Sequence, residues 1–113
     1  MQVIATKITQ NPAIVKFELD EIIVRTENFE FKNIDETQNS PLAKQLFFLP
    51  FVKTVYISGN FIAIEKFSIV EWEDVQEDVA NQINEFISNG GIIIQVDEKK
   101  TKKQPVTVYA ETT

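Results

Sequence analysis

The chain has 113 residues, of which 43% are hydrophobic and 25% charged, and its formal net charge is −6. This length suits one domain, and these fractions exclude a wholly disordered chain. There is no Cys and no His, which excludes disulfides, Cys/His zinc sites, cysteine-ligated iron–sulfur clusters and histidine-based triads. The acidic charge argues against nonspecific binding to nucleic acid or to anionic membranes.

The N-terminal residues 1–8 are too short and too polar for the apolar part of a signal peptide. No apolar run approaches the roughly 20 residues that a membrane span needs. We therefore expect a cytoplasmic protein.

The first third of the chain predicts a meander of strands. Pro12 removes an amide donor and favours an extended Asn11, so a turn is expected there. The flanking runs alternate in hydrophobicity or are rich in β-branched residues, which is typical of strands. Residues 33–39 are polar and aperiodic and are expected to form a loop. The strands are expected at residues 3–8, 14–19, 22–25 and 29–31.

Ser40 and Pro41 predict the start of a short helix that Pro50 ends, because Ser caps helices well and Pro costs nothing at the first helical position. Its apolar stripe is expected to comprise Leu42, Leu46 and Leu49, widened by Phe47 and Phe48. Residues 52–57 and 61–66 flank a Gly-Asn pair and predict a β-hairpin.

A longer helix is predicted from Trp72 to the stop signal Asn89-Gly90. At 100° per residue its apolar side chains fall in one arc of about 120°, which is a core-facing stripe. That stripe is expected to comprise Trp72, Val75, Val79, Ile83, Phe86 and Ile87. Residues 92–94 are expected to form a last buried strand.

The predicted elements indicate an α+β fold, a two-layer sandwich with a mostly antiparallel sheet and two helices on one face. Residues 1–96 are expected to form this domain. Residues 97–105 carry four Lys and nothing apolar, a linker composition. Residues 106–113 regain strand character, and we interpret them as the truncated start of a second copy of the domain, with a final edge strand as the alternative.

Acidic residues on the second helix form the most conspicuous candidate site. They include Glu73, Asp74, Glu77 and Asp78, and no basic residue lies between Lys66 and Lys99. Three interpretations stay open: a solvated face with acids placed favourably near a helix N-terminus, a site for Mg²⁺ or Ca²⁺, and a docking face for a basic partner. The twelve-residue calcium-loop pattern is missing, which weighs against the metal.

Several landmarks together resemble the N-terminal domain of the Nfu (NifU-like) family of iron–sulfur cluster scaffold and carrier proteins. The strongest is the run of residues 40–43, Ser-Pro-Leu-Ala. The others are Thr9-Gln10-Asn11-Pro12, Lys16-Phe17, Leu46-Phe47, Val52, Val55, Phe61-Ile62, Lys66 and Trp72. Two positions depart from the family pattern: Gln10 stands where a proline is usual, and Phe51 where a glycine is usual.

The resemblance implies a non-catalytic accessory domain that binds protein partners, either cluster assembly factors or client apoproteins, and neither nucleic acid nor membrane. We expect the contacts at Asn11, Pro12, Glu73, Asp74, Glu77 and Asp78. In the family, the cluster is held by a Cys-x-x-Cys pair in a separate C-terminal domain. This chain lacks such a pair, so no cofactor is expected here. The rival hypotheses are a small enzyme that uses carboxylates and a divalent cation, and a purely structural dimerisation domain.

Overall fold

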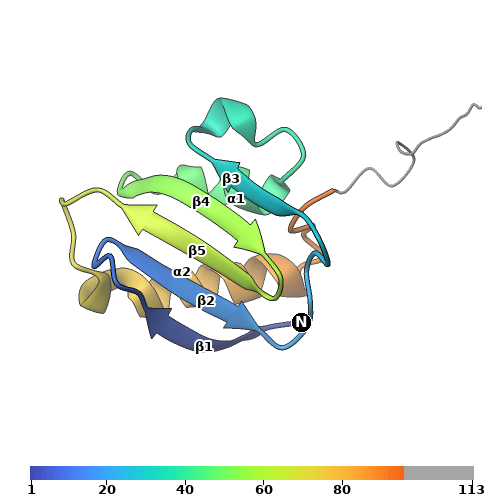
Figure 1. Ribbon diagram of the computed structural model, residues 1–113, viewed down its shortest axis with the longest axis horizontal. Helices are drawn as coiled ribbons and strands as arrows, with labels where there is room; N and C mark the ends of the chain where they lie inside the picture. The colour runs from blue at the N-terminus through green and yellow to red at the C-terminus, as the bar shows by residue number, and fades with distance from the viewer. Residues whose placement is uncertain (96–113) are drawn as a thin grey trace, which may run out of the picture.

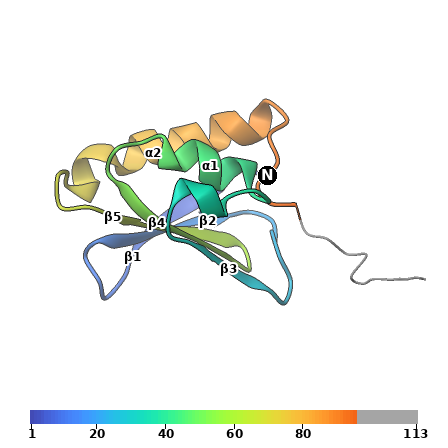
Figure 2. The same ribbon diagram turned by 90° about the horizontal axis from the view of Figure 1, so that it is seen from above.

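A computed structural model describes residues 1–95. Five antiparallel strands form one sheet, and two α-helices lie together on one of its faces (Figures 1 and 2). The order across the sheet is β1-β2-β5-β4-β3. This arrangement confirms the predicted α+β sandwich. The elements are β1 Val3–Ile8, β2 Ile14–Leu19, β3 Asn28–Phe31, the 3-10 turn η1 Ile34–Glu36, α1 Pro41–Phe47, β4 Val52–Ser58, β5 Phe61–Lys66 and α2 Trp72–Ser88.

Alternation along the strands places one face of the sheet in the core. On β2, Val15, Phe17 and Leu19 are buried, whereas Lys16 and Glu18 between them are only partly buried. Successive side chains of a strand point to opposite faces, so the charged residues of β2 lie on the face without helices. The predicted hairpin is confirmed as β4 and β5, which turn at Gly59 with a left-handed φ of 54°.

Helix α1 begins as its capping signal predicts. The Ser40 hydroxyl oxygen accepts a hydrogen bond from the Ala43 amide at 3.1 Å, and the hydroxyl donates to the carbonyl of Ile93 at 2.6 Å. Leu42 and Leu46 are buried, as predicted. Phe48, predicted to widen the apolar stripe, is 63% exposed. This prediction was wrong because Phe48, although its backbone stays helical, lies about 100–160° around the helix from Leu42, Leu46 and Leu49.

Helix α2 confirms the longest predicted segment, and Gly90 follows it with a left-handed φ of 86°. The stripe runs through the buried Trp72, Val79 and Ile83. Val75 and Phe86, which were expected to be mostly buried, are only partly buried. Periodicity places a residue on a face of the helix, but the exposed fraction depends on how far α1 and the sheet extend beneath it.

Two predicted strands are absent from the described residues. The segment 22–25 is irregular because the amides of Ile23 and Val24 both donate to the carbonyl of Gly59, at 2.8 and 3.2 Å. The segment 92–94 is also irregular. The carbonyl of its buried Ile93 accepts a hydrogen bond from the Ser40 hydroxyl, and the amide of Gln95 donates to the carbonyl of Asn39. Both apolar runs therefore fill the core through tertiary hydrogen bonds rather than as strands. The predicted loop 33–39 contains the turn η1.

The domain boundaries proposed from the sequence stay predictions. The linker at 97–105 and the second-copy segment at 106–113 lie outside the described residues. Among residues 1–95, no helix has the length and apolar character to cross a membrane.

Candidate functional site

The turn between β1 and β2 is fixed by its own side chains. The Asn11 side-chain oxygen accepts from the Ala13 amide at 2.9 Å, and the Asn11 carbonyl accepts from the Ile14 amide at 2.9 Å. The Thr9 hydroxyl donates to the Asn11 carbonyl, also at 2.9 Å. An Asn side chain commonly holds a turn in this way. The sequence-predicted contact residues Asn11 and Pro12 are both exposed on the resulting ordered loop.

Trp72 joins this turn to the first residues of α2. Its indole N–H donates to the carbonyl of Ala13 at 2.7 Å, although the two residues are 59 positions apart. The indole packs edge-on against Phe17 and Phe51, with ring centroids 5.8 and 6.3 Å away. Buried indoles usually find such a hydrogen-bond partner, and edge-on packing is favourable for aromatic rings. Trp72 is the predicted core anchor, and it also sets the position of the turn relative to the helix.

The acidic residues of α2 start beside this junction. Glu73 and Asp74 lie in the first turn of the helix, and Glu77 and Asp78 follow one turn later; all four are exposed. Within residues 1–95, none of the ion pairs involves these carboxylates. Acids in the first turn complement the helix dipole. The second pair stands four residues after the first, however, and like charges at that spacing destabilise a helix slightly. Helix stability alone therefore does not account for all four.

Exposed apolar residues lie at the same end of the domain, in the connection from β5 to α2. Phe67 is 46% and Ile69 is 66% exposed. The backbone places this connection, because the Lys66 amide donates to the Ala13 carbonyl and the Phe67 amide donates to the Phe51 carbonyl. Sequence reasoning missed both residues, since an apolar residue next to a strand is normally expected in the core. Their position after Lys66, where the strand alternation stops, was the available signal.

We call this region the turn–helix end: Asn11, Pro12, Phe67, Ile69, Glu73 and Asp74. Figure 1 shows the β1–β2 turn and the start of α2 at the same end of the domain, at the left, away from the last described residues, and Figure 2 shows that the turn bends toward the helix-free side of the sheet. The structure thus places four predicted contact residues at the same end of the domain. Glu77 and Asp78 continue from it along α2.

The described residues offer little for catalysis. Residues 1–95 contain no group of three or more acidic, His or Cys side chains arranged to hold a metal ion. One side chain has a clearly shifted acidity: burial raises the pKa of the Tyr56 phenol, and the nearby Glu30 and Glu65 carboxylates raise it further. Tyr56 lies on the helix-free face of the sheet, and burial together with neighbouring carboxylates raises the pKa of any tyrosine in this way.

The sequence pattern of the family described as "Scaffold protein Nfu/NifU N terminal" matches residues 4–90. The chain belongs to this family. The matched range includes the β1–β2 turn, the capped helix α1, the β4–β5 hairpin and all of α2. The resemblance inferred from the sequence is therefore confirmed.

Named relatives agree with this assignment. The mitochondrial NFU1 iron-sulfur cluster scaffold homolog of Drosophila sechellia is 33% identical over 88 residues, which cover 77% of this chain and 31% of that protein. The mitochondrial NifU-like protein 5 of Arabidopsis thaliana is 24% identical and is matched over 96% of this chain and 39% of its own length. The chain thus spans about a third of these relatives.

Solved structures show the same fold. A NifU-like protein of Saccharomyces cerevisiae, solved by NMR, superposes with a TM-score of 0.71 and 24% identity, over 85% of this chain and 87% of that one. A crystal structure of a Staphylococcus aureus protein gives a TM-score of 0.64 with 22% identity, over 74% and 99% of the two chains.

Proposed function

We propose that this domain is a non-catalytic accessory module of an iron–sulfur cluster scaffold or carrier, and that it binds protein partners through the turn–helix end. The partners are cluster assembly factors or client apoproteins. Family membership supports the scaffold setting, since relatives of this chain are named as iron-sulfur cluster scaffold homologs. The composition supports the choice of partner, because a net charge of −6 disfavours nucleic acid and anionic membranes.

The observation that carries the proposal is the hydrogen bond from Trp72 to Ala13. It ties Ala13, at the base of the ordered Asn11-Pro12 loop, to the first residue of α2, and Phe67 and Ile69 are exposed in the connection that leads into this helix. An apolar contact beside charges that form no ion pair within residues 1–95 is the composition of a protein-binding patch, since the apolar part supplies affinity and the charges select the partner. The expected partner surface combines Lys or Arg with an apolar side chain.

We further propose that no iron–sulfur cluster is bound by this chain itself. A cluster needs thiolate ligands, or imidazoles in part, and the sequence contains neither Cys nor His. The cluster would be held by the Cys-x-x-Cys domain that the family resemblance implies for the parent protein. The partner-binding domain would then bring client and cluster together, which raises the effective concentration of one for the other.

Charge-reversal variants of the complete parent protein test the proposal. Proteins that co-purify with the parent are quantified by mass spectrometry for the wild type, for a form without residues 1–96, and for the double variant Glu73→Lys/Asp74→Lys. The matched control is Glu27→Lys/Asp35→Lys, which makes the same charge change at exposed positions outside the turn–helix end. We expect the Glu73/Asp74 variant to lose the partners that the deletion loses, and the control to keep them. An unchanged set of partners after deletion would refute the proposal.

The cytoplasmic location inferred from the sequence stays a prediction. Relatives reported above are named as mitochondrial proteins. Fractionation of cells, with detection of the parent protein by immunoblotting, decides between the two compartments.

A further inference from the structure

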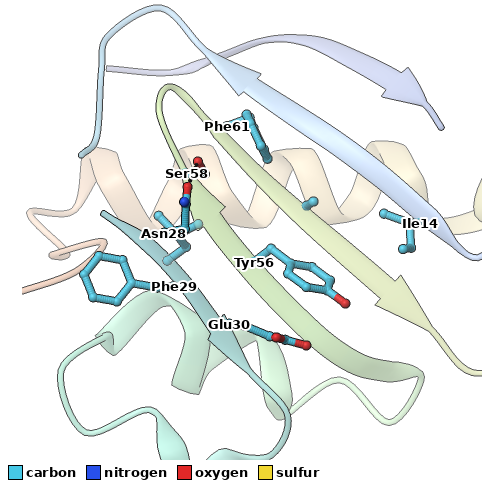
Figure 3. A pocket seen from close by; sticks show the side chains of 9 residues that line it. Ile14, Asn28, Phe29, Glu30, Tyr56, Ser58 and Phe61 are labelled. Carbon is cyan, nitrogen blue, oxygen red and sulfur yellow. Dashed lines mark hydrogen bonds between the residues drawn. The ribbon is translucent and has the colours of Figure 1, made fainter. Parts of the chain in front are cut away.

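The face of the sheet that the helices leave uncovered carries a shallow hollow. Its floor is Ala63, which is only 5% exposed although it faces away from the helices. The hollow is open to solvent and measures about 510 Å³, and the partly buried side chains of Ile14, Tyr56 and Phe61 are among those that line it. Figure 3 shows these three side chains in front of the sheet, with α2 behind it. A small residue between large ones leaves a hole into which another side chain can fit.

A row of cross-strand neighbours runs through this hollow. Lys16 on β2 pairs with Ala63 on β5, Ala63 pairs with Tyr56 on β4, and Tyr56 pairs with Glu30 on β3. Neighbouring strands lie about 4.8 Å apart, so the two ends of the row are separated by roughly 14 Å. Beyond Lys16 the row continues to Lys7 on β1, whose ammonium is paired with Glu18. Between β2 and β3 the row therefore has a cation at one end, an anion at the other, and a hole beside a large ring at its centre.

The two charged ends of the row have no opposite charge bound to them within the described residues. The ion pairs on this face join Lys7 to Glu18 at 3.2 Å and Lys53 to Glu65 at 3.7 Å. The Lys16 ammonium instead lies 4.5 Å from the ring centroid of Phe61.

We propose that this face binds the same face of a second copy of this chain, through a two-fold axis that runs parallel to the strands between β4 and β5. This rotation exchanges the two ends of the row. Lys16 then lies opposite Glu30 of the second copy, and Tyr56 lies over the hollow at Ala63 of the second copy. Each contact occurs twice, as a two-fold interface requires. The strands of the two sheets stay aligned, which is the usual geometry of a sheet-on-sheet sandwich.

Charge distinguishes this arrangement from the other simple face-to-face two-fold. An axis across the strands, along the row, would place Lys16 over Lys16 and Glu30 over Glu30, and like charges facing each other disfavour a complex. A protein unrelated to this chain would not be expected to carry charges opposite to both Lys16 and Glu30 at the same spacing. When the row of a second copy runs in the opposite direction, its anion faces the cation and its ring faces the hole. A second copy of the chain presents such a reversed row.

The area of the face indicates a weak dimer. With the axis between β4 and β5, β1 has no strand opposite it, so only β2, β5, β4 and β3 meet strands of the second copy. Four strands about 4.8 Å apart and about six residues at roughly 3.3 Å each give a contact face of about 380 Å² per copy. Stable interfaces bury about 800 Å² per partner, so we expect association only at high concentration.

Charge-swap variants test the proposal on the 113-residue chain. The mass in solution is measured by sedimentation equilibrium from micromolar to millimolar concentration for the wild type, for Lys16→Glu, for Glu30→Lys, and for an equimolar mixture of the two variants. The matched controls are Lys44→Glu on α1 and Glu85→Lys on α2, both exposed positions of the helix layer. Circular dichroism verifies that each variant is folded.

We expect the wild-type mass to rise from 13.0 kDa toward twice that value as the concentration increases. Each single charge reversal should weaken association about tenfold, because two attractive pairs become repulsive. The mixture should recover association. In a mixed dimer, both glutamates of the Lys16→Glu variant, one at each end of the row, face the two lysines of the Glu30→Lys variant. A wild-type mass that stays at 13.0 kDa, a mixture that associates no better than its components, or controls that weaken association equally would each overturn the proposal.

Discussion

Replacing Trp72 with Phe tests whether one side chain joins the β1–β2 turn to α2. The substitution keeps an aromatic ring near Phe17 and Phe51 but removes the N–H that reaches the Ala13 carbonyl. That carbonyl keeps a second donor, the Lys66 amide at 3.0 Å. The backbone oxygen is therefore not left unsatisfied, and the loss of the hydrogen bond should cost about 1 kcal/mol.

The smaller ring adds a packing cost. Trp72 is only 6% exposed, so the lost atoms leave a void in the core. Truncation of a buried Trp to Ala costs roughly 3–5 kcal/mol, and because Phe keeps most of the ring volume we expect a packing cost of about 1–2 kcal/mol. We expect the free energy of unfolding to fall by about 2–3 kcal/mol in total. A domain of this size is stable by about 5–15 kcal/mol, so the variant should stay folded.

Urea unfolding followed by circular dichroism measures the total loss in the free energy of unfolding. Amide hydrogen exchange shows which part of the backbone is destabilised. Exchange should accelerate at the amides of Ala13 and Ile14, which depend on the turn. Tyr56→Phe is the control, because it removes a polar group from an aromatic ring on the opposite face of the sheet. The reasoning fails if Trp72→Phe changes the unfolding free energy by less than about 0.5 kcal/mol, the range of neutral surface substitutions, or if the turn amides keep their wild-type exchange rates.

Three further predictions concern the cap, the tyrosine and the cluster. Ser40→Ala removes both a helix cap and the donor to the Ile93 carbonyl, so urea unfolding should show a loss of about 2–3 kcal/mol; a loss below about 1 kcal/mol would contradict the cap geometry. Burial and nearby carboxylates raise the Tyr56 pKa above 10.0, so its contribution to stability is complete below pH 10.0 and is lost as pH rises through the folded pKa; phenolate absorbance in a Tyr109→Phe variant measures that pKa, and a value at or below 10.0 would be inconsistent with the site. Anaerobic reconstitution with iron and sulfide should leave the visible absorbance of the chain unchanged, because it has no thiolate or imidazole ligands; a stoichiometric cluster on the chain would disprove this.

Local signals were sufficient for most elements. Ser40-Pro41 predicted the start of α1, because a cap is formed by residues that are adjacent in sequence. Gly59-Asn60 predicted the hairpin and Asn89-Gly90 the end of α2, since both turns need backbone conformations that few residues adopt. The apolar period of α2 identified its buried face through Val79 and Ile83.

Apolar runs without a local signal were misassigned. Residues 22–25 and 92–94 have the composition of strands but do not pair with a neighbouring strand. Two amides of the first segment donate to the Gly59 carbonyl. In the second, the Ile93 carbonyl accepts from the Ser40 hydroxyl, and the adjoining Gln95 amide donates to the Asn39 carbonyl. The composition of a segment predicts that it is buried, but it does not predict which groups form hydrogen bonds with its amides and carbonyls. Those partners lie tens of residues away, so only the folded chain selects them.

The sequence by itself determined the class of the fold, its family and the absence of thiolate and imidazole ligands, because caps, turns, periodicity and residue types are local properties. The tertiary structure alone decided where the candidate contacts lie. Asn11 and Glu73 are far apart in the chain, and they share one end of the domain because Trp72 reaches Ala13 across the core. The order of the strands likewise decided which side chains face Ala63 on the open sheet. Side chains from distant segments are brought together by packing, and packing is decided by the whole chain at once.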